Sequence, residues 1–320
     1  MFRLFMTVAL LLAAQPVFCW GFFGHRRINE YAIYLLPPEM LVFYKPRLAY
    51  IRDHAVDPDK RRYILKAEAP RHYIDLDQYG PYPFSSLPRN WDSAVARYGE
   101  DSLLAHGIVP WRILQVVGTL TKAFRQRDGK AILKTSTDLG HYIADAHVPL
   151  HTSSNHNGQH TGQHGIHGFW ESRLPELLAD AEWDFLLGRA AYIDNMEERV
   201  WQTVLESAAA VDSVLQIEQQ LTNSLPPDAK YAFEWRNQQV VKQYAAGFSR
   251  RYNKLLRGMV ERRMQQSIVM VAGTWYTAWV NAGQPDLRGL DPGLPPVDSL
   301  LLDSLLLQQR KIITNAKTCD

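Results

Sequence analysis

The segment "KAILKTSTDLGHYIADAH" (residues 130–147) carries apolar residues at helical spacing and ends shortly before Pro149. Apolar positions that recur every three or four residues indicate a helix with one face on a core. His141 and Asp145 are four residues apart within it, so a helix places them on one face, about 6 Å apart along the axis. The segment therefore predicts a core helix that carries an imidazole beside a carboxylate.

Further helical patterns lie on both sides of this segment. They cover 25–36, 110–127, 197–221, a run near 233–258, and 266–283, and no alternating strand pattern interrupts them. Proline and glycine fall between them, at 80–88, 224–227 and 284–296. We expect an all-α fold, with one compact multi-helix domain over 20–283 and a linker and short C-terminal tail over 284–320. The linker is expected at 284–298, and 299–317 reads as a short amphipathic helix.

The composition is that of a globular protein, with 46% hydrophobic and 21% charged residues and a net charge of +2 over 320 residues. This small charge gives no overall electrostatic reason to bind nucleic acid or an anionic membrane. Arg3 and the apolar run "LFMTVALLLAA" indicate a secretory signal peptide over 1–19, cleaved before Trp20. Cys19 is alternatively a lipidation site, but the bulky Phe18 before it disfavours that signal.

We therefore expect an extracytoplasmic protein, periplasmic or secreted. After cleavage Cys319 is the one remaining cysteine, so an internal disulfide is excluded. Any metal site must use nitrogen and oxygen ligands.

Seven of the eleven histidines fall within residues 139–171. His167 and Glu171 repeat the four-residue spacing, and His151 follows Pro149. One such pair is usually a surface ion pair, whereas two pairs with His151 make a frame for more than one metal ion. The remaining histidines of the polar loop are expected to be solvated and not ligands: His156, His160 and His164.

Four separated motifs together carry a family resemblance: "WGFFGH" (20–25), "HYID" (72–75), "HYIADAHVPLH" (141–151) and "HGFWE" (167–171). They resemble the superfamily of zinc-dependent phospholipases C and single-strand-specific nucleases of the P-one and S-one type. The resemblance covers most of 20–283. It implies an all-helical secreted domain whose mature N-terminal tryptophan binds metal through its amine and carbonyl.

Carried over to this chain, the resemblance implies three zinc ions. The first is bound by Asp57, His72, His141 and Asp145; the second by Asp145, His25 and Trp20; the third by His151, His167 and Glu171. Asp59 is the alternative to Asp57, and the nearby His54 has no support from the resemblance. His147 matches a family histidine that supports the ligands without binding metal.

The resemblance implies a zinc-dependent phosphodiesterase that uses a metal-activated hydroxide. Asp57 is expected to orient that water or take its proton, and Lys60 stands where the nucleases carry an arginine near the phosphate. The substrate is either single-stranded nucleic acid, as "WGxxGH" suggests, or phospholipid, as Glu171 suggests. The alternatives are a non-catalytic zinc-binding protein and a helical interaction protein that docks through its tail. We expect a monomer without a stable partner.

Overall fold

The computed structural model describes residues 20–236 and 239–293. The predicted signal peptide (1–19) and amphipathic tail (299–317) lie outside the described residues. The elements are α1 Gly21–Tyr34, α2 Pro38–Tyr44, η1 Lys45–Arg47, α3 Leu48–Asp53, α4 Asp57–Arg62, η2 Ala69–His72, η3 Leu76–Tyr79, α5 Trp91–Tyr98, α6 Glu100–His106, α7 Val109–Gln126, α8 Gly129–Ala146, η4 Pro149–Thr152, α9 Ile166–Gly168, η5 Phe169–Arg173, α10 Leu174–Glu182, α11 Met196–Ser224, η6 Pro227–Ala229, β1 Tyr231–Arg236, β2 Gln239–Tyr244, α12 Ala246–Leu255 and α13 Met259–Asn281.

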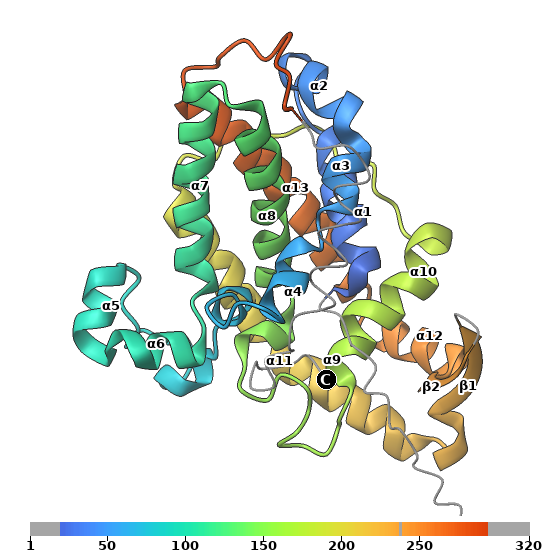
Figure 1. The fold of residues 1–320 in the computed structure, drawn as a ribbon. Helices are drawn as coiled ribbons and strands as arrows, with labels where there is room; N and C mark the ends of the chain where they lie inside the picture. The colour runs from blue at the N-terminus through green and yellow to red at the C-terminus, as the bar shows by residue number, and fades with distance from the viewer. Residues whose placement is uncertain (1–19, 237–238, 294–320) are drawn as a thin grey trace, which may run out of the picture.

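The predicted all-α fold is confirmed, because the described residues form a compact helical domain with one small two-stranded sheet. Helix α8 lies at its centre, packed against α1, α7 and α13 (Figure 1). Asp128 caps α8 by accepting a hydrogen bond from the amide of Ala131 at 2.9 Å. Residues 136–150 are all buried, so the second half of α8 is enclosed on every side. This half carries His141 and Asp145.

Helices α1 and α8 approach closely because residue 140 is a glycine. A Cβ atom at Gly140 would lie 2.0 Å from Oδ1 of Asn29, far inside van der Waals contact. The Asn29 amide instead donates to the carbonyl of Thr137 at 3.2 Å. His25 lies one helical turn before Asn29, so this contact brings its ring against His141, the neighbour of Gly140. The packing of two helices thus begins the histidine cluster.

The predicted helical run near 233–258 is wrong in its first half. Strands β1 and β2 form an antiparallel hairpin in which Tyr231 faces Tyr244 and Trp235 faces Val240. Only from Ala246 onward is the chain helical, in α12. The signal for the hairpin is the alternation of Tyr231, Phe233 and Trp235, a period of two that favours a strand.

The first part of the predicted linker packs on the domain. Leu287 is 2% exposed, and the carbonyl of Leu290 accepts a hydrogen bond from Arg47 at 2.7 Å. Across the described residues, no single helix has both the length and the apolar character needed to cross a bilayer. Helices α6 and α7 pass that test only as a pair, and they are bent by 99°.

Candidate metal centre

The carboxylate of Asp145 is fully buried and lies within 4.0 Å of four imidazole rings. Its oxygens are 3.4 Å from Nε2 of His25 and 2.9 Å from Nδ1 of His72. They are 3.2 Å from Nε2 of His141 and 4.0 Å from Nδ1 of His151. These residues come from α1, from η2, and from α8 with the adjoining η4, so three segments distant in sequence meet at one carboxylate.

Three of the buried histidines use Nδ1 to bind a backbone carbonyl. His141 bonds to Ala55 at 2.8 Å, His151 to the carbonyl of His72 at 2.5 Å, and His167 to His156 at 3.1 Å. With Nδ1 donating to a carbonyl, Nε2 is the ring atom directed to the centre, which is the orientation of a metal-bound histidine. These three hydrogen bonds from Nδ1 to backbone carbonyls fix where the three Nε2 atoms point.

His72 has the opposite orientation. Its Nδ1 faces the centre, 3.1 Å from Nε2 of His141, and its Nε2 lies 3.9 Å from the buried carboxylate of Glu68. Arg71 holds Glu68 at 2.6 Å, and the hydroxyl of Tyr142 donates to it. A carboxylate behind a ligating imidazole orients the ring and raises its basicity. Sequence reasoning missed Glu68, although its position four residues before His72 places it within reach.

The described residues contain three groups that could hold a metal ion: His25, His141 and Asp145; Asp59, His72 and His141; and His151, His167 and Glu171. Several of their buried polar atoms have no hydrogen-bond partner among the described residues: both ring nitrogens of His25, both oxygens of Asp59 and Glu171, Oδ1 of Asp145, and Nε2 of His151 and His167. Buried polar atoms are rarely left unpaired, because each costs about 1–3 kcal/mol. Nitrogen and oxygen donors in this number fit divalent cations such as zinc.

The third group is formed by a wide helical turn. In α9 and the π-helical turn η5, Nε2 of His167 lies 3.0 Å from Oε2 of Glu171. Nε2 of His151 lies 3.5 Å from the same oxygen. Short π-helical turns are frequent at functional sites. His156 supports the group through its carbonyl, while His160 and His164 are exposed and lie outside all three groups.

Asp59, and not Asp57, reaches the centre. Oδ1 of Asp59 is 3.7 Å from Nε2 of His141, whereas Asp57 binds His54 at 2.5 Å and Lys60 at 2.9 Å. The two aspartates belong to α4, where two positions apart means roughly 200° around the axis. When Asp59 points inward, Asp57 must point outward. The expected position of Asp57 beside His72 and His141 is therefore corrected to Asp59.

The same geometry places Lys60 away from the centre and Arg62 beside it. Lys60 lies on the outer face with Asp57, and its side chain is 42% exposed. Arg62 is 3% exposed, three residues after Asp59, with its guanidinium 3.8 Å from Oδ1. Burial opposes the charge, but Asp59 raises the pKa of Arg62 above its ordinary value. A guanidinium, with its two-pronged geometry, thus lies beside the centre.

Charges within the centre favour cation binding. Burial opposes ionisation of Asp145, yet His141 and His151 hold its pKa well below its usual range. Burial lowers the pKa of both His25 and His72, and the charge of His141 contributes to both shifts. The centre therefore offers an ionised Asp145 and neutral His25 and His72. Burial opposes their charge, but neighbouring carboxylates raise the pKa of His141 to about 9 and that of His151 above its ordinary value, so these two imidazoles must release a proton when they bind metal.

Trp20, just before α1, packs against residues that precede two of the carboxylates. Its fully buried indole donates to the carbonyl of Ala144 at 2.8 Å and packs edge-to-face on Trp170, with centroids 5.4 Å apart. Ala144 precedes Asp145 and Trp170 precedes Glu171, so the main chain of Trp20 is held near two of the carboxylates. The Trp20 carbonyl accepts from Gly24 at 2.9 Å.

His147 lies behind the centre. Its Nδ1 donates to the carbonyl of Ile143 at 2.7 Å. The backbone carbonyl of His147 accepts a hydrogen bond from Nε of Arg263 at 3.0 Å. Burial, with the charge of Arg263, lowers its pKa well below the ordinary value. Its contacts run toward α13, and it belongs to none of the three metal-binding groups.

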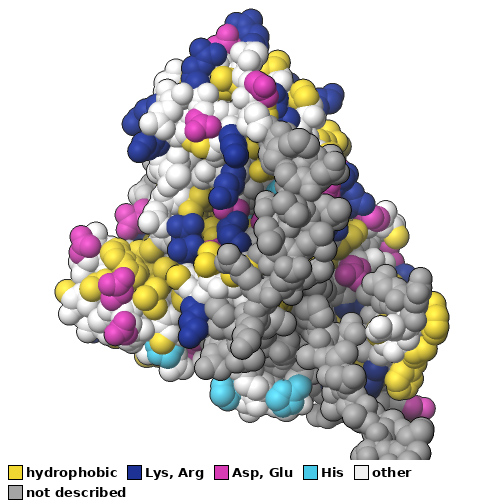
Figure 2. All heavy atoms as spheres, viewed as in Figure 1, with side chains coloured by type: hydrophobic (Ala, Val, Ile, Leu, Met, Phe, Trp, Pro, Cys, Tyr) yellow, Lys and Arg dark blue, Asp and Glu magenta, His cyan; other side chains and the backbone are white. Residues whose placement is uncertain are grey.

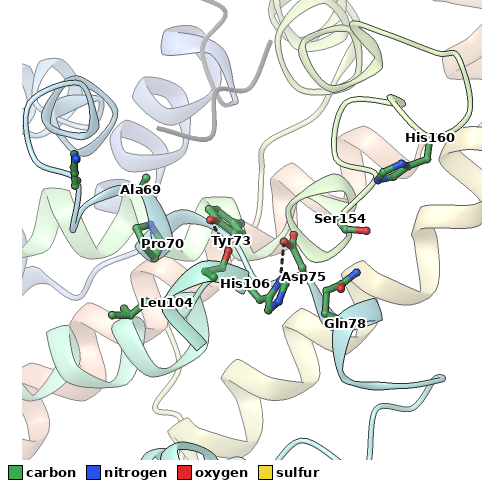
Figure 3. Close-up of a pocket in the computed structure, with 11 residues that line it drawn as sticks. Ala69, Pro70, Tyr73, Asp75, Gln78, Leu104, His106, Ser154 and His160 are labelled. Atoms are coloured by element: carbon green, nitrogen blue, oxygen red, sulfur yellow. Dashed lines mark hydrogen bonds and ion pairs between the residues drawn. The ribbon is translucent and has the colours of Figure 1, made fainter. Parts of the chain in front are cut away.

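Figure 3 shows a cavity of about 530 Å³ on the segment that follows His72 in sequence. Tyr73 and Asp75, which follow His72 in sequence, line it together with Gln78 and His106. Oδ2 of Asp75 lies 3.8 Å from Nδ1 of His106. Burial raises the pKa of the Tyr73 phenol, so it remains protonated. The cavity combines one phenol and two imidazoles with other hydrogen-bonding groups.

Neither the models of known protein families nor the curated proteins contain a match to this chain.

Proposed function

We propose that this chain is a zinc-dependent phosphodiesterase that acts on single-stranded nucleic acid outside the cytoplasm. One observation carries the proposal: the buried Asp145 carboxylate lies within 4.0 Å of four imidazoles, beside a second group of His151, His167 and Glu171. The unpaired donor atoms of these residues suit several metal ions close together. Zinc ions bound there would lower the pKa of water and stabilise charge on a phosphodiester oxygen.

The chain's own groups have distinct tasks in such a reaction. Asp59 has two buried carboxylate oxygens, and we assign it the proton of the attacking water. Arg62 supplies a fixed positive charge for a phosphate oxygen, a task that suits a guanidinium better than an ammonium. Cleavage before Trp20 would free an amine next to the centre, which adds a nitrogen ligand to His25 and Asp145.

The cavity lined by Tyr73 and Asp75 favours nucleic acid over phospholipid. Tyr73 offers a ring for stacking, and Asp75 and Gln78 offer hydrogen bonds to the edge of a base. A choline headgroup is usually enclosed by several aromatic rings, whereas this lining has one phenol. Phospholipid therefore serves as the comparison substrate.

The test uses residues 20–320, produced with Trp20 as the first residue. Hydrolysis of bis(4-nitrophenyl) phosphate should be abolished by a chelator and restored by zinc, and single-stranded DNA or RNA should be cleaved faster than phosphatidylcholine. A His164→Ala variant, which removes an exposed histidine, should behave as wild type. A zinc-loaded chain that hydrolyses none of these substrates would instead support a non-catalytic zinc-binding protein. Faster cleavage of phosphatidylcholine would reverse the substrate assignment.

A further inference from the structure

The β1–β2 hairpin displays large apolar side chains to solvent. Phe233 is 75% exposed, Trp235 is 72% exposed and Val240 is 59% exposed. In the pairing register Trp235 faces Val240 and Phe233 faces Lys242, so all four share one face of the ribbon. Figure 2 shows a hydrophobic strip along this edge of the molecule. Contiguous exposed apolar surface of this kind usually marks a contact site.

Contacts on both faces fix the hairpin to the protein. Glu234 pairs with Arg173, whose Nε also donates to the carbonyl of Tyr244 at 3.1 Å. Tyr244 shares the face of Val240 and Lys242 but is buried, and its ring stacks on Phe169 with centroids 3.7 Å apart. Phe169 and Arg173 are the first and last residues of η5, the turn that carries Glu171. The apolar face is therefore held rigidly relative to the metal centre.

Exposed cations lie on the hairpin and on the segment that follows it, which includes helix α12 beside the hairpin (Figure 1). Residues 239–257 contain Lys242, Arg250, Arg251, Lys254 and Arg257 and no acidic residue, and all five are exposed. Lys242 lies on the hairpin face itself, with Nζ 4.4 Å from the centroid of the Tyr231 ring. Arg250 pairs with Glu182. The basic stretch after β2 is thus a charged surface next to the exposed aromatic residues.

Aromatic side chains with a cationic surround match the interface of an anionic bilayer. Tryptophan and phenylalanine enter the headgroup region, while lysine and arginine remain at the level of the lipid phosphates. Single-stranded nucleic acid fits this face less well. Proteins that bind single strands usually do so in a positively charged groove, whereas this apolar strip lies on the outer edge of the molecule (Figure 2).

We propose that the β1–β2 hairpin docks the protein on an anionic lipid surface, with Phe233, Trp235 and Val240 inserted among the headgroups. Lys242 and the exposed cations of α12 contact the lipid phosphates. This docking is independent of the substrate of the metal centre.

The test is co-sedimentation of residues 20–320 with vesicles of phosphatidylcholine, with and without phosphatidylglycerol. The chain should bind the anionic vesicles, and F233S/W235S should bind at least about tenfold more weakly, since membrane affinity follows buried apolar area. Leu186→Ser is the matched control, because Leu186 is 91% exposed and lies outside the hairpin. A K242E/R251E variant should lose the preference for anionic lipid. Circular dichroism and zinc content of all variants should equal wild type.

Equal vesicle binding by wild type and F233S/W235S would overturn the proposal. Failure to bind both kinds of vesicle would also overturn it, since another occupant would then cover the hairpin. A dimer in sedimentation velocity that F233S/W235S abolishes would identify a second copy as that occupant. Loss of single-stranded DNA binding in the variant, with vesicle binding unchanged, would assign the face to nucleic acid.

Discussion

Replacement of Gly140 by alanine tests how the packing of two helices builds the centre. The added Cβ would lie 2.0 Å from Oδ1 and 2.8 Å from Cγ of Asn29, so the entire amide must move by more than 1 Å. Overpacking of this kind costs about 1–3 kcal/mol, and the better helix propensity of alanine returns up to about 1 kcal/mol. We expect a net loss of about 1–2 kcal/mol in the free energy of unfolding.

The displacement should act selectively on metal binding. His25 and His141 stack with centroids 3.8 Å apart, so separation of α1 from α8 moves His25 away from Asp145. We expect the zinc affinity of the His25 site to fall at least about tenfold, equivalent to 1.4 kcal/mol. The group of His151, His167 and Glu171 should be unaffected.

Zinc titration by calorimetry and urea unfolding measure both effects. Gly118→Ala in α7 is the matched control, because no heavy atom lies within 4 Å of its added Cβ, and it should be neutral or stabilising. An Asn29→Ala change should relieve the clash in the double variant. If Gly140→Ala retains full zinc affinity at every site, the reasoning from helix approach is refuted.

Four further predictions concern the centre. Asp59→Asn should remove one zinc ion by metal analysis, whereas Asp57→Asn should retain all three; the reverse result would restore Asp57 as the ligand. Arg62→Gln should lower kcat/KM by about 10²-fold at unchanged zinc content, as expected for loss of a charged hydrogen bond, and Lys60→Gln should leave it unchanged. Burial opposes ionisation of Glu171, but His167 and His151 hold its pKa at about 2, so this carboxylate stays ionised in mild acid. Acidification should therefore release zinc by protonating the histidines, and zinc retention measured by dialysis should fall between about pH 6 and 5. Zinc retention at pH 4 would contradict this. One glycine added before Trp20 turns its amine into an amide and should weaken one zinc site in calorimetry without changing the other two.

Much of the architecture follows from periodicity in the sequence. The patterns at 110–127, 130–147, 197–221 and 266–283 correspond to α7, α8, α11 and α13. The hairpin was missed because the helical pattern of α12 was extended backward over alternating residues. Asn29 facing Gly140 could not be foreseen, because neither residue signals by itself which helix it packs against.

The residues of the candidate centre are likewise only partly predictable from the sequence. Spacing brought His141 to Asp145 and His167 to Glu171 because four residues make one helical turn. The choice between Asp57 and Asp59 depends on where α4 begins and how it is rotated. The sequence "DPD" determines neither the start of the helix nor its rotation. Arg62 was missed for the same reason. Glu68 supports His72 across a short 3₁₀ turn, which has no periodic signature.

Anomalous X-ray diffraction at the zinc edge, from crystals of residues 20–320 grown with zinc, tests the central claim most directly. The account predicts three peaks: one among Asp59, His72, His141 and Asp145, one beside His25 and Trp20, and one among His151, His167 and Glu171. Ligand distances should be about 2.0–2.2 Å. Peaks confined to the exposed His160 and His164, or none within the buried cluster, would contradict it.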